Sequence, residues 1–417
     1  MLADGRSSGG RPSSRFGRNS WMIANPSKPP LAMPYWLTCG FRPFFFLGAL
    51  VMAASILAWL PMLAGAYQLP TSFTLRDWHV HTMLFGGLPA IIAGFALTAA
   101  SNWTGRPPVA GGELALLLVL WLAGILAVSV SAWIGAPAAA VIDLAFPAAL
   151  AGMLAREVIA AGNYRNLRVV ALVALLGLAN GGFHLEAAHA GLADYSVRAG
   201  IGLVLALVML VGGRIIPAFT RNWLAARKAA ALPAPFGRYD AATVAVSAAA
   251  LLAWTAWPWA DASAALLILA GIMNLVRMAR WQGLQTRSEP LLWVLHLAYA
   301  TLPLGFAMVG ASILAPGSVD PTGAIHVWAA GTFGAMTLAV MTRASRGHSG
   351  QPLAAGRLEV AIYGLVLLGA LARVAAPYLP GEIGRGLEFA GLAWALAFLG
   401  FALGYGRMLL LPPARRA

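Results

Sequence analysis

The stretch GELALLLVLWLAGILAVSVSAW, residues 112–133, decides the fold class. After Glu113 it contains no charged residue, and about 20 apolar residues are what a helix needs to cross a bilayer. Similar runs recur along the 417-residue chain, which is 60% hydrophobic and only 10% charged, against ~25% in soluble domains. Backbone polar groups in lipid must be satisfied within each segment. The sequence therefore predicts an all-α, polytopic membrane helix bundle.

Charged residues and clusters of Pro and Gly divide the chain into about twelve membrane spans. We expect them at 41–64, 78–100, 112–133, 136–158, 167–187, 195–218, 241–260, 262–281, 290–314, 322–343, 357–377 and 386–410. Residues 37–411 are predicted to form a single transmembrane domain. Residues 1–36 are rich in Gly, Ser, Pro and Arg and are predicted to be a disordered basic tail, and 412–417 a short basic tail.

Basic residues divide unequally between the two sides of these spans. The chain has 28 Lys and Arg, and only Arg76, Arg198, Arg373 and Arg385 fall on one side, which leaves 24 on the other. This bias predicts that both termini are cytoplasmic, and an even number of spans agrees with it. It also explains the net charge of +14 without a nucleic-acid partner, which we do not expect.

The ends of the second, sixth and tenth spans resemble one another. Thr98, Thr220 and Thr342 follow at equal steps of 122 residues, which is four spans. This period predicts a repeat of three four-helix units, at 37–160, 161–283 and 284–411. The core subunit of haem–copper oxidases also consists of three units of four spans, and the comparison is an analogy. The alternative is a chance similarity among helix ends rich in Ala, Leu and Thr.

Four of the seven histidines share one depth in the predicted outer third of the bilayer. These are His79, His81, His184 and His326. Each alone is explained by a hydrogen bond to a loop carbonyl at the membrane surface. Together, imidazoles at one depth on three spans are what a haem or metal site in a helix bundle requires.

The spacing of these histidines favours two sites. His79 and His81 are two residues apart, so on a regular helix they point to nearly opposite sides. We expect one of them to pair with His326 as haem ligands, and the other to hold a second metal with His184, such as copper. His296 lies nearer the inner side and is predicted to belong to another site with His348, which is expected in a cytoplasmic loop. His189 is expected in an outer loop, in water.

Other residues are predicted to complete a haem site. Arg76 is placed to bind a propionate at the outer side. Large aromatic side chains are expected against the ring faces, namely Trp78, Phe85, Trp328 and Phe333.

Two further polar residues stand inside the spans. Asp143 is interpreted as a proton or ion relay, as the partner of an arginine, or as a hydrogen-bonding group between helices. Arg214 is predicted to bind a propionate or another anion at the inner side, beside a helix break at Pro217.

Several chemistries are excluded. The single cysteine, Cys39, rules out an intramolecular disulfide and a site built from cysteines. No phosphate-binding GxxxxGK[ST] loop and no HExxH or GxSxG motif is present.

Five stretches of the chain closely resemble the NnrS family. They are GFRPFF (40–45), WHVHTM (78–83), NWTGRP (102–107), GRIIPAFTRN (213–222) and MTRASRGHSG (341–350). The likeness extends from about Leu37 to the C-terminus. It implies a twelve-span protein of the bacterial inner membrane that carries haem b and copper and is linked to denitrification and nitric oxide.

The resemblance also implies which residues act. The histidines at matching motif positions are His79, His81, His296, His326 and His348. The family usually has Glu after the second histidine of the WHxH motif, where this chain has Thr82. No acid–base or metal role of that carboxylate can therefore be carried over.

Three functions remain open at this stage. The first is a haem protein that binds or turns over nitric oxide or a related small ligand, with membrane lipid around it and an electron donor as a partner. The second is a secondary transporter in which His79, His326 and Asp143 relay protons. The third is a factor that holds haem or copper in transit.

Overall fold

The computed structural model describes residues 33–413, and within them the fold is entirely helical. In this part of the chain, 12 helices are long and apolar enough to cross a membrane, which confirms the predicted fold class. Most of the predicted tail 1–36 and the last residues of 412–417 lie outside the described residues. Tyr35 and Trp36, at the end of the predicted tail, belong to a short 3₁₀-helix, η1 (Tyr35–Leu37).

The spans follow one another with short connections. In order they are α1 (Phe41–Leu63); α2, η2 and α3 (Leu75–His81, Thr82–Gly87, Leu88–Thr104); α4 (Gly112–Ser129), followed by the short α5 (Ser131–Ile134); α6 (Ala136–Ala160); η3 and α7 (Tyr164–Asn166, Leu167–Ala190); α8, η4 and α9 (Asp194–Leu207, Val208–Gly212, Gly213–Ala226); α10 (Arg238–Ala256); α11 (Asp261–Ala279), followed by η5 (Gly283–Thr286); α12 (Pro290–Leu314); α13, η6 and α14 (Pro321–His326, Val327–Phe333, Gly334–His348); α15 and η7 (Arg357–Ala375, Ala376–Tyr378); and α16 (Ile383–Leu410).

One expectation about a span is wrong. Pro217 was expected to break the sixth span, but it lies inside α9, which continues to Ala226. A π-helical turn, η4, directly precedes α9. Local π-helical adjustment is one way in which membrane helices tolerate proline.

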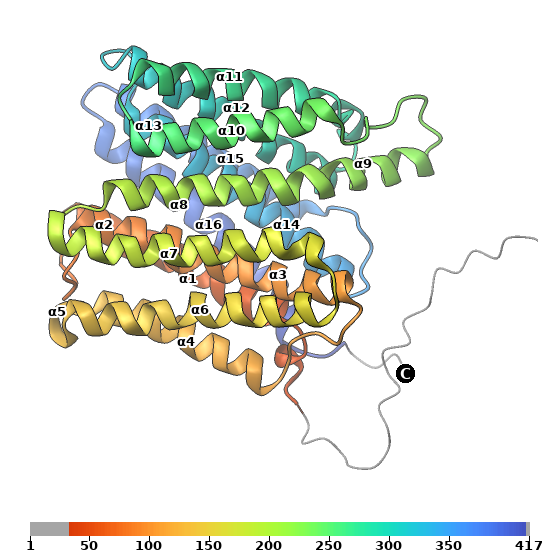
Figure 1. Ribbon diagram of the computed structural model, residues 1–417, viewed down its shortest axis with the longest axis horizontal. Coiled ribbons are helices and arrows are strands. Elements are labelled where there is room, and N and C mark those ends of the chain that lie inside the picture. Colours follow the sequence, from red (N-terminus) through yellow and green to blue (C-terminus); the bar gives the residue numbers. More distant parts are fainter. Residues whose placement is uncertain (1–32, 414–417) are drawn as a thin grey trace, which may run out of the picture. The chain divides into compact units, whose positions relative to one another are not determined.

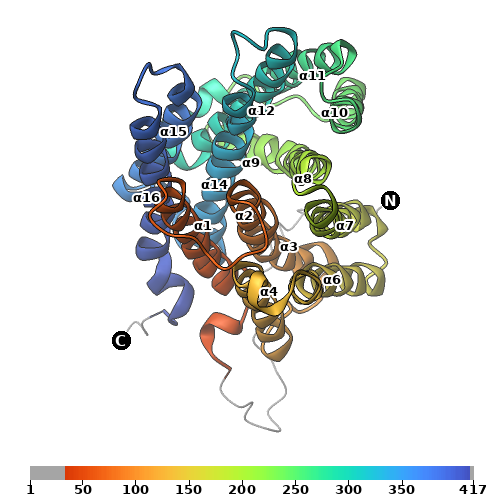
Figure 2. The same ribbon diagram turned by 90° about the vertical axis from the view of Figure 1, so that its left-hand side faces the viewer.

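The helices of the unit Pro34–Ala417 pack side by side in nearly antiparallel order (Figure 1). α4 packs on α6, α10 on α11, and α15 on α16. α1 packs on both α3 and α16, so the first and last spans are neighbours and close the bundle. Viewed along the helix axes, α2 and α14 lie near the middle of the bundle, and α8 lies closer to the middle than α7 and α10, which flank it (Figure 2).

These middle helices belong to the second, sixth and tenth spans, the ones that share sequence features. Buried residues make up 78%, 56% and 67% of their most apolar segments, against at most 50% in the other described spans. Each also contains a π-helical turn, η2, η4 or η6. A repeat of four spans would place one such helix from each unit at the centre.

The three repeated threonines have the same local role. Thr98, Thr220 and Thr342 are buried, and each hydroxyl donates a hydrogen bond to the carbonyl four residues earlier. Each hydroxyl also joins its span to another element. The partners are the Phe41 amide at 3.0 Å, His296 Nε2 at 2.8 Å and the Tyr363 hydroxyl at 2.6 Å.

A buried ionic network joins α10, α11 and α12. Arg277 is only 2% exposed, and its Nε donates to Asp240 Oδ1 at 3.2 Å. Its Nη1 donates to the Tyr299 hydroxyl at 3.1 Å, which in turn donates to Asn274 Oδ1 at 3.1 Å. The half-buried Arg280 is a second partner of Asp240, at 3.0 Å. A buried guanidinium is tolerated here because a carboxylate and a hydroxyl satisfy it.

We therefore expect Asp240→Asn to lower the free energy of unfolding by about 3–5 kcal/mol, because Arg277 would stay buried without its anion. Denaturant unfolding of the purified protein, followed by circular dichroism, measures the change. The control is Glu382→Gln, which breaks an exposed pair with Arg385 and should cost less than about 1 kcal/mol. Equal effects of the two substitutions would contradict the assignment.

Candidate functional site

A cavity of about 800 Å³ opens at the predicted outer end of the bundle, within the size range of ligand pockets. Its wall comes from the first, second, sixth, seventh, ninth, tenth, eleventh and twelfth spans and is mostly apolar. Polar side chains in the wall include Arg76, His79, Asp194, Arg198, His326 and Arg373. A large apolar cavity with a few converging polar groups is the typical form of a ligand site.

His326 enters this cavity with a defined tautomer. It is the last residue of α13, and its Nδ1 lies 2.7 Å from the carbonyl oxygen of Thr322. A carbonyl only accepts, so Nδ1 carries the proton and donates it. Nε2 of the neutral ring then keeps its lone pair, which is the state in which imidazole binds metals.

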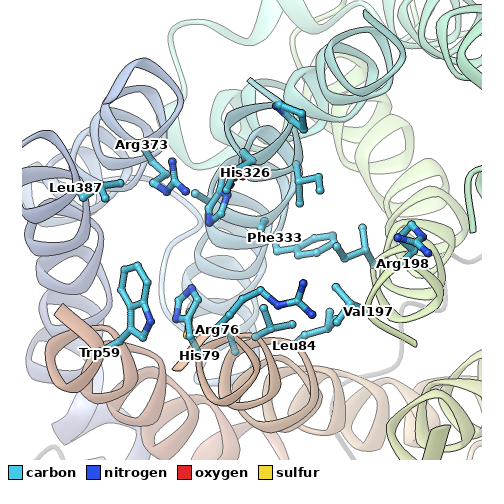
Figure 3. Close-up of a pocket in the computed structure, with 18 of the residues that line it drawn as sticks. Trp59, Arg76, His79, Leu84, Val197, Arg198, His326, Phe333, Arg373 and Leu387 are labelled. Atoms are coloured by element: carbon cyan, nitrogen blue, oxygen red, sulfur yellow. Dashed lines mark hydrogen bonds between the residues drawn. The ribbon is translucent and has the colours of Figure 1, made fainter. Parts of the chain in front are cut away.

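His79 faces the same cavity from α2. Its ring stacks on Trp59, with centroids 4.4 Å apart and planes 27° apart. Figure 3 shows the imidazoles of His79 and His326 directed towards one another. Neither His79 Nδ1 nor Trp59 Nε1 has a hydrogen-bond partner among the described residues, although both atoms are buried. Buried polar atoms without a partner are uncommon, and both of these belong to residues that line the cavity, which makes it a candidate ligand site.

Three arginines stand around the two imidazoles (Figure 3). Arg76 forms ion pairs with Asp77 at 2.8 Å and Asp194 at 2.6 Å, which tie the beginnings of the second and sixth spans together. Arg198 and Arg373 form no ion pair in the described part of the chain. These are three of the four basic residues that the sequence places on the predicted outer side.

A second polar cluster lies between the second, fourth and fifth spans. Asp143 Oδ2 accepts hydrogen bonds from His81 Nε2 at 3.1 Å, His184 Nε2 at 3.0 Å and Asn180 Nδ2 at 2.7 Å. His81 Nε2 also lies 2.9 Å from Asn180 Oδ1. All four side chains are buried. One carboxylate oxygen thus receives three donors, and Asp143 serves as a hub rather than as the partner of an arginine.

This cluster has the donor set of a metal site. One ligand atom from each of His81, Asp143 and His184 lies within 4.8 Å of the others. Two imidazoles and a carboxylate suit first-row transition metals. The rings of Phe73 and Phe183 pack on both histidines and shield them. Gly124 gives the carboxylate room, since a Cβ there would be 2.8 Å from Asp143 Oδ1.

A family model described as NnrS protein matches residues 35–412, nearly the whole chain. The chain belongs to the NnrS family. Membership relates it to nitric oxide and to metal binding, and the buried histidine–aspartate cluster is able to hold a metal. No curated protein matches the chain in a search by sequence.

The structure of this NnrS family member separates the two histidines of the WHxH motif. His79 turns to the cavity and His81 to the Asp143 cluster. The pair that shares the cavity is His79 with His326, and His81 lies with His184. Asp143 belongs to the second group, where it forms hydrogen bonds between helices, one of the three roles that the sequence left open.

The predicted ring-face residues need correction. Phe333 lines the cavity, but Trp78, Phe85 and Trp328 do not. Trp78 donates to Ser129 at 3.4 Å, Phe85 packs on His81, and Trp328 donates to the Leu302 carbonyl at 3.0 Å. Depth in the membrane alone indicated these residues, and depth does not determine towards which neighbouring helix a side chain turns.

The inner-side predictions also change. The structure does not bring His296 and His348 together: His296 bonds to Thr220, whereas His348 packs on Phe41 with centroids 5.5 Å apart. His348 ends α14 and does not lie in a loop.

Arg214 and His189 lie outside the cavity wall. Arg214 lies half-buried near the beginning of α9. His189 is exposed, as expected, but in the last turn of α7 and not in a loop.

Sequence reasoning missed Trp59, Asn180, Arg198 and Arg373. A signal for the arginines was present, because basic residues on the outer side are exceptions to the positive-inside bias. Nothing in the local sequence distinguishes Trp59 from the other tryptophans, or Asn180 from a helix-packing residue.

The close packing of Gly124 against Asp143 can be tested by substitution. Gly124→Ala should lower the free energy of unfolding by about 1–3 kcal/mol, because the added Cβ would meet Asp143 at both its side chain and its Cα. Gly152→Ala is the matched control, since a Cβ there meets nothing within 4 Å. Thermal unfolding should show a lower midpoint for the first and an unchanged or higher one for the second. The reverse order would contradict the packing.

Proposed function

We propose that this protein is a haem-binding protein of the bacterial inner membrane that binds nitric oxide, in nitric oxide handling or detoxification during denitrification. One observation carries the proposal: His79 and His326, from spans far apart in the sequence, face one another in a cavity of about 800 Å³. Family membership supports the link to nitric oxide.

The residues of the cavity fit haem b. Its porphyrin is flat and largely apolar, the cavity wall is mostly apolar, and imidazoles of His79 and His326 would hold its iron. His326 offers a bare Nε2, and His79 has a ring nitrogen without a partner. Bound and reduced by an electron donor, haem supplies an iron that binds nitric oxide.

Copper is the second metal that we propose, at His81, Asp143 and His184. Imidazole is a suitable ligand for copper, and the carboxylate offsets charge that a buried cation would otherwise leave uncompensated. To bind a metal, the Nε2 atoms of both histidines would give up the protons that they donate to Asp143. Asn180 would remain to orient the carboxylate.

The sidedness of the proposal follows from the charge bias. The 24 basic residues on one side, against four on the other, support an orientation with both termini in the cytoplasm and the cavity open towards the periplasm. A small uncharged ligand such as nitric oxide reaches a site in that position from the lipid or from the periplasm.

An optical spectrum tests the haem proposal directly. The purified protein should show the Soret band of haem, and nitric oxide should shift it. His326→Ala should lose the band, whereas the exposed His189→Ala should keep it. A colourless, folded wild-type protein would refute the haem proposal and favour a transporter instead. Transfer of the haem to an acceptor protein during purification would favour a role in trafficking.

Metal analysis tests the second site. We expect stoichiometric copper in the wild type, loss of copper in His184→Ala, and retention in His189→Ala. Because His184 lies outside the cavity wall, the Soret band should persist in His184→Ala. Copper content that does not depend on His184 would remove this assignment and leave the haem proposal standing.

A further inference from the structure

The arginines of the cavity differ in how their charges are satisfied. Arg76 has two carboxylate partners, Asp77 and Asp194, and the Asp77 carboxylate also accepts the amide of Ala193 at 3.0 Å. This closed group holds the second span against the sixth. Arg76, the arginine expected to bind a propionate, is therefore already occupied.

Arg198 and Arg373 are not satisfied in this way. Arg198 Nε is buried without a hydrogen-bond partner among the described residues, and its guanidinium carbon lies 4.8 Å from the centre of the Tyr195 ring. Arg373 is half-buried and makes neither a hydrogen bond nor an ion pair in the same part of the chain. The nearby carboxylates, Asp194 and Asp320, do not pair with them.

A guanidinium cannot lose its proton in a protein, so both positive charges persist. A positive charge at an apolar wall is unfavourable when no anion pairs with it. An anionic ligand is therefore the simplest explanation for two arginines at this wall. Asp194 makes its ion pair with Arg76. Asp194 and Glu186 also lie near Arg198, and Asp320 lies near Arg373, but no carboxylate of the described residues bonds to either guanidinium. The N–H donors of both arginines thus remain available to a ligand. The ligand that matches has two acid groups.

The positions of the two arginines also indicate what shape the ligand must have. Figure 3 shows Arg373 beside His326 and Arg198 on the other side of the imidazole pair, beyond Phe333. They come from the eleventh and sixth spans, which contact the cavity from different directions. A ligand that reaches both needs an apolar body between the imidazoles and two separate acid groups near the predicted outer end.

We infer that Arg198 and Arg373 form a two-point carboxylate clamp, one arginine for each acid group of a dicarboxylate porphyrin. This inference rests on the proposed function. It adds that the two arginines determine which porphyrin binds and in which orientation. The guanidinium of each arginine presents paired N–H donors that match a carboxylate. Apolar contacts and imidazoles hold the ring, and the two arginines fix its acid edge towards the periplasmic side.

The test uses the full-length protein from haem-limited cells, in detergent, titrated with haem b or with its dimethyl ester, in which both acid groups are neutral. Quenching of tryptophan fluorescence gives the affinity, and the absorbance spectrum reports histidine ligation. Arg198→Gln and Arg373→Gln should each weaken haem binding on the order of tenfold, and the double variant on the order of a hundredfold. The ester should bind wild type and variants alike.

Arg385→Gln is the control, because Arg385 is also on the predicted outer side but is exposed and pairs with Glu382. It should leave both affinities unchanged. Equal binding of haem and ester to the wild type would overturn the clamp while leaving the haem site intact. Equal weakening of both ligands in the variants would also overturn it, because the arginines would then only shape the cavity.

Two more outcomes distinguish a failure of the arginine clamp from a failure of the haem proposal. If the wild type binds neither porphyrin through histidine, the proposed function fails and the clamp with it. An anionic lipid headgroup is the competing ligand. If the variants lose bound phosphatidylglycerol in lipid nanodiscs and keep their haem affinity, the arginines hold lipid and the clamp is refuted.

Discussion

The absence of water in the bilayer core is the constraint on which the rest of this structure depends. Every polar group in a span has to find its partner inside the protein, because lipid offers none. Asp240 with Arg277, and Asp143 with its three donors, obey this rule inside the bundle. The cavity wall is an exception, because some of its buried polar atoms have no partner within the described part of the protein. Of the seven buried side-chain atoms without a partner in residues 33–413, three line the cavity, on Trp59, His79 and Arg198.

The three central spans explain why the polar sites lie where they do. In the second span His81 directly precedes the π-helical turn η2, and in the tenth His326 directly precedes η6. The sixth span has Leu207 at the corresponding place before η4. π-Helical turns occur often at functional sites because they re-aim neighbouring side chains. The same helical irregularity therefore follows a histidine of a candidate site in two spans, and in the sixth span it follows an apolar residue.

The two candidate sites are joined by one short segment of α2. His79 and His81 project to different sides of that helix, so the cavity and the Asp143 cluster share a wall. Stacking on Trp59 holds the first ring, and hydrogen bonds to Asp143 and Asn180 hold the second. This segment of α2 (Leu75–His81) is therefore the structural link between the two candidate sites of this NnrS family member.

The sequence by itself determined the membrane class, the twelve spans and the common depth of four histidines, because length and hydropathy are local properties that lipid enforces on each helix. It also separated His79 from His81, since helical spacing alone turns them apart. Only the tertiary structure decided that Asp143 joins His81 and His184, and that Trp78 and Trp328 face away from the cavity. The direction of a side chain around a buried helix depends on which helices surround it. In a chain this uniformly apolar, hydrophobic periodicity carries little of that information.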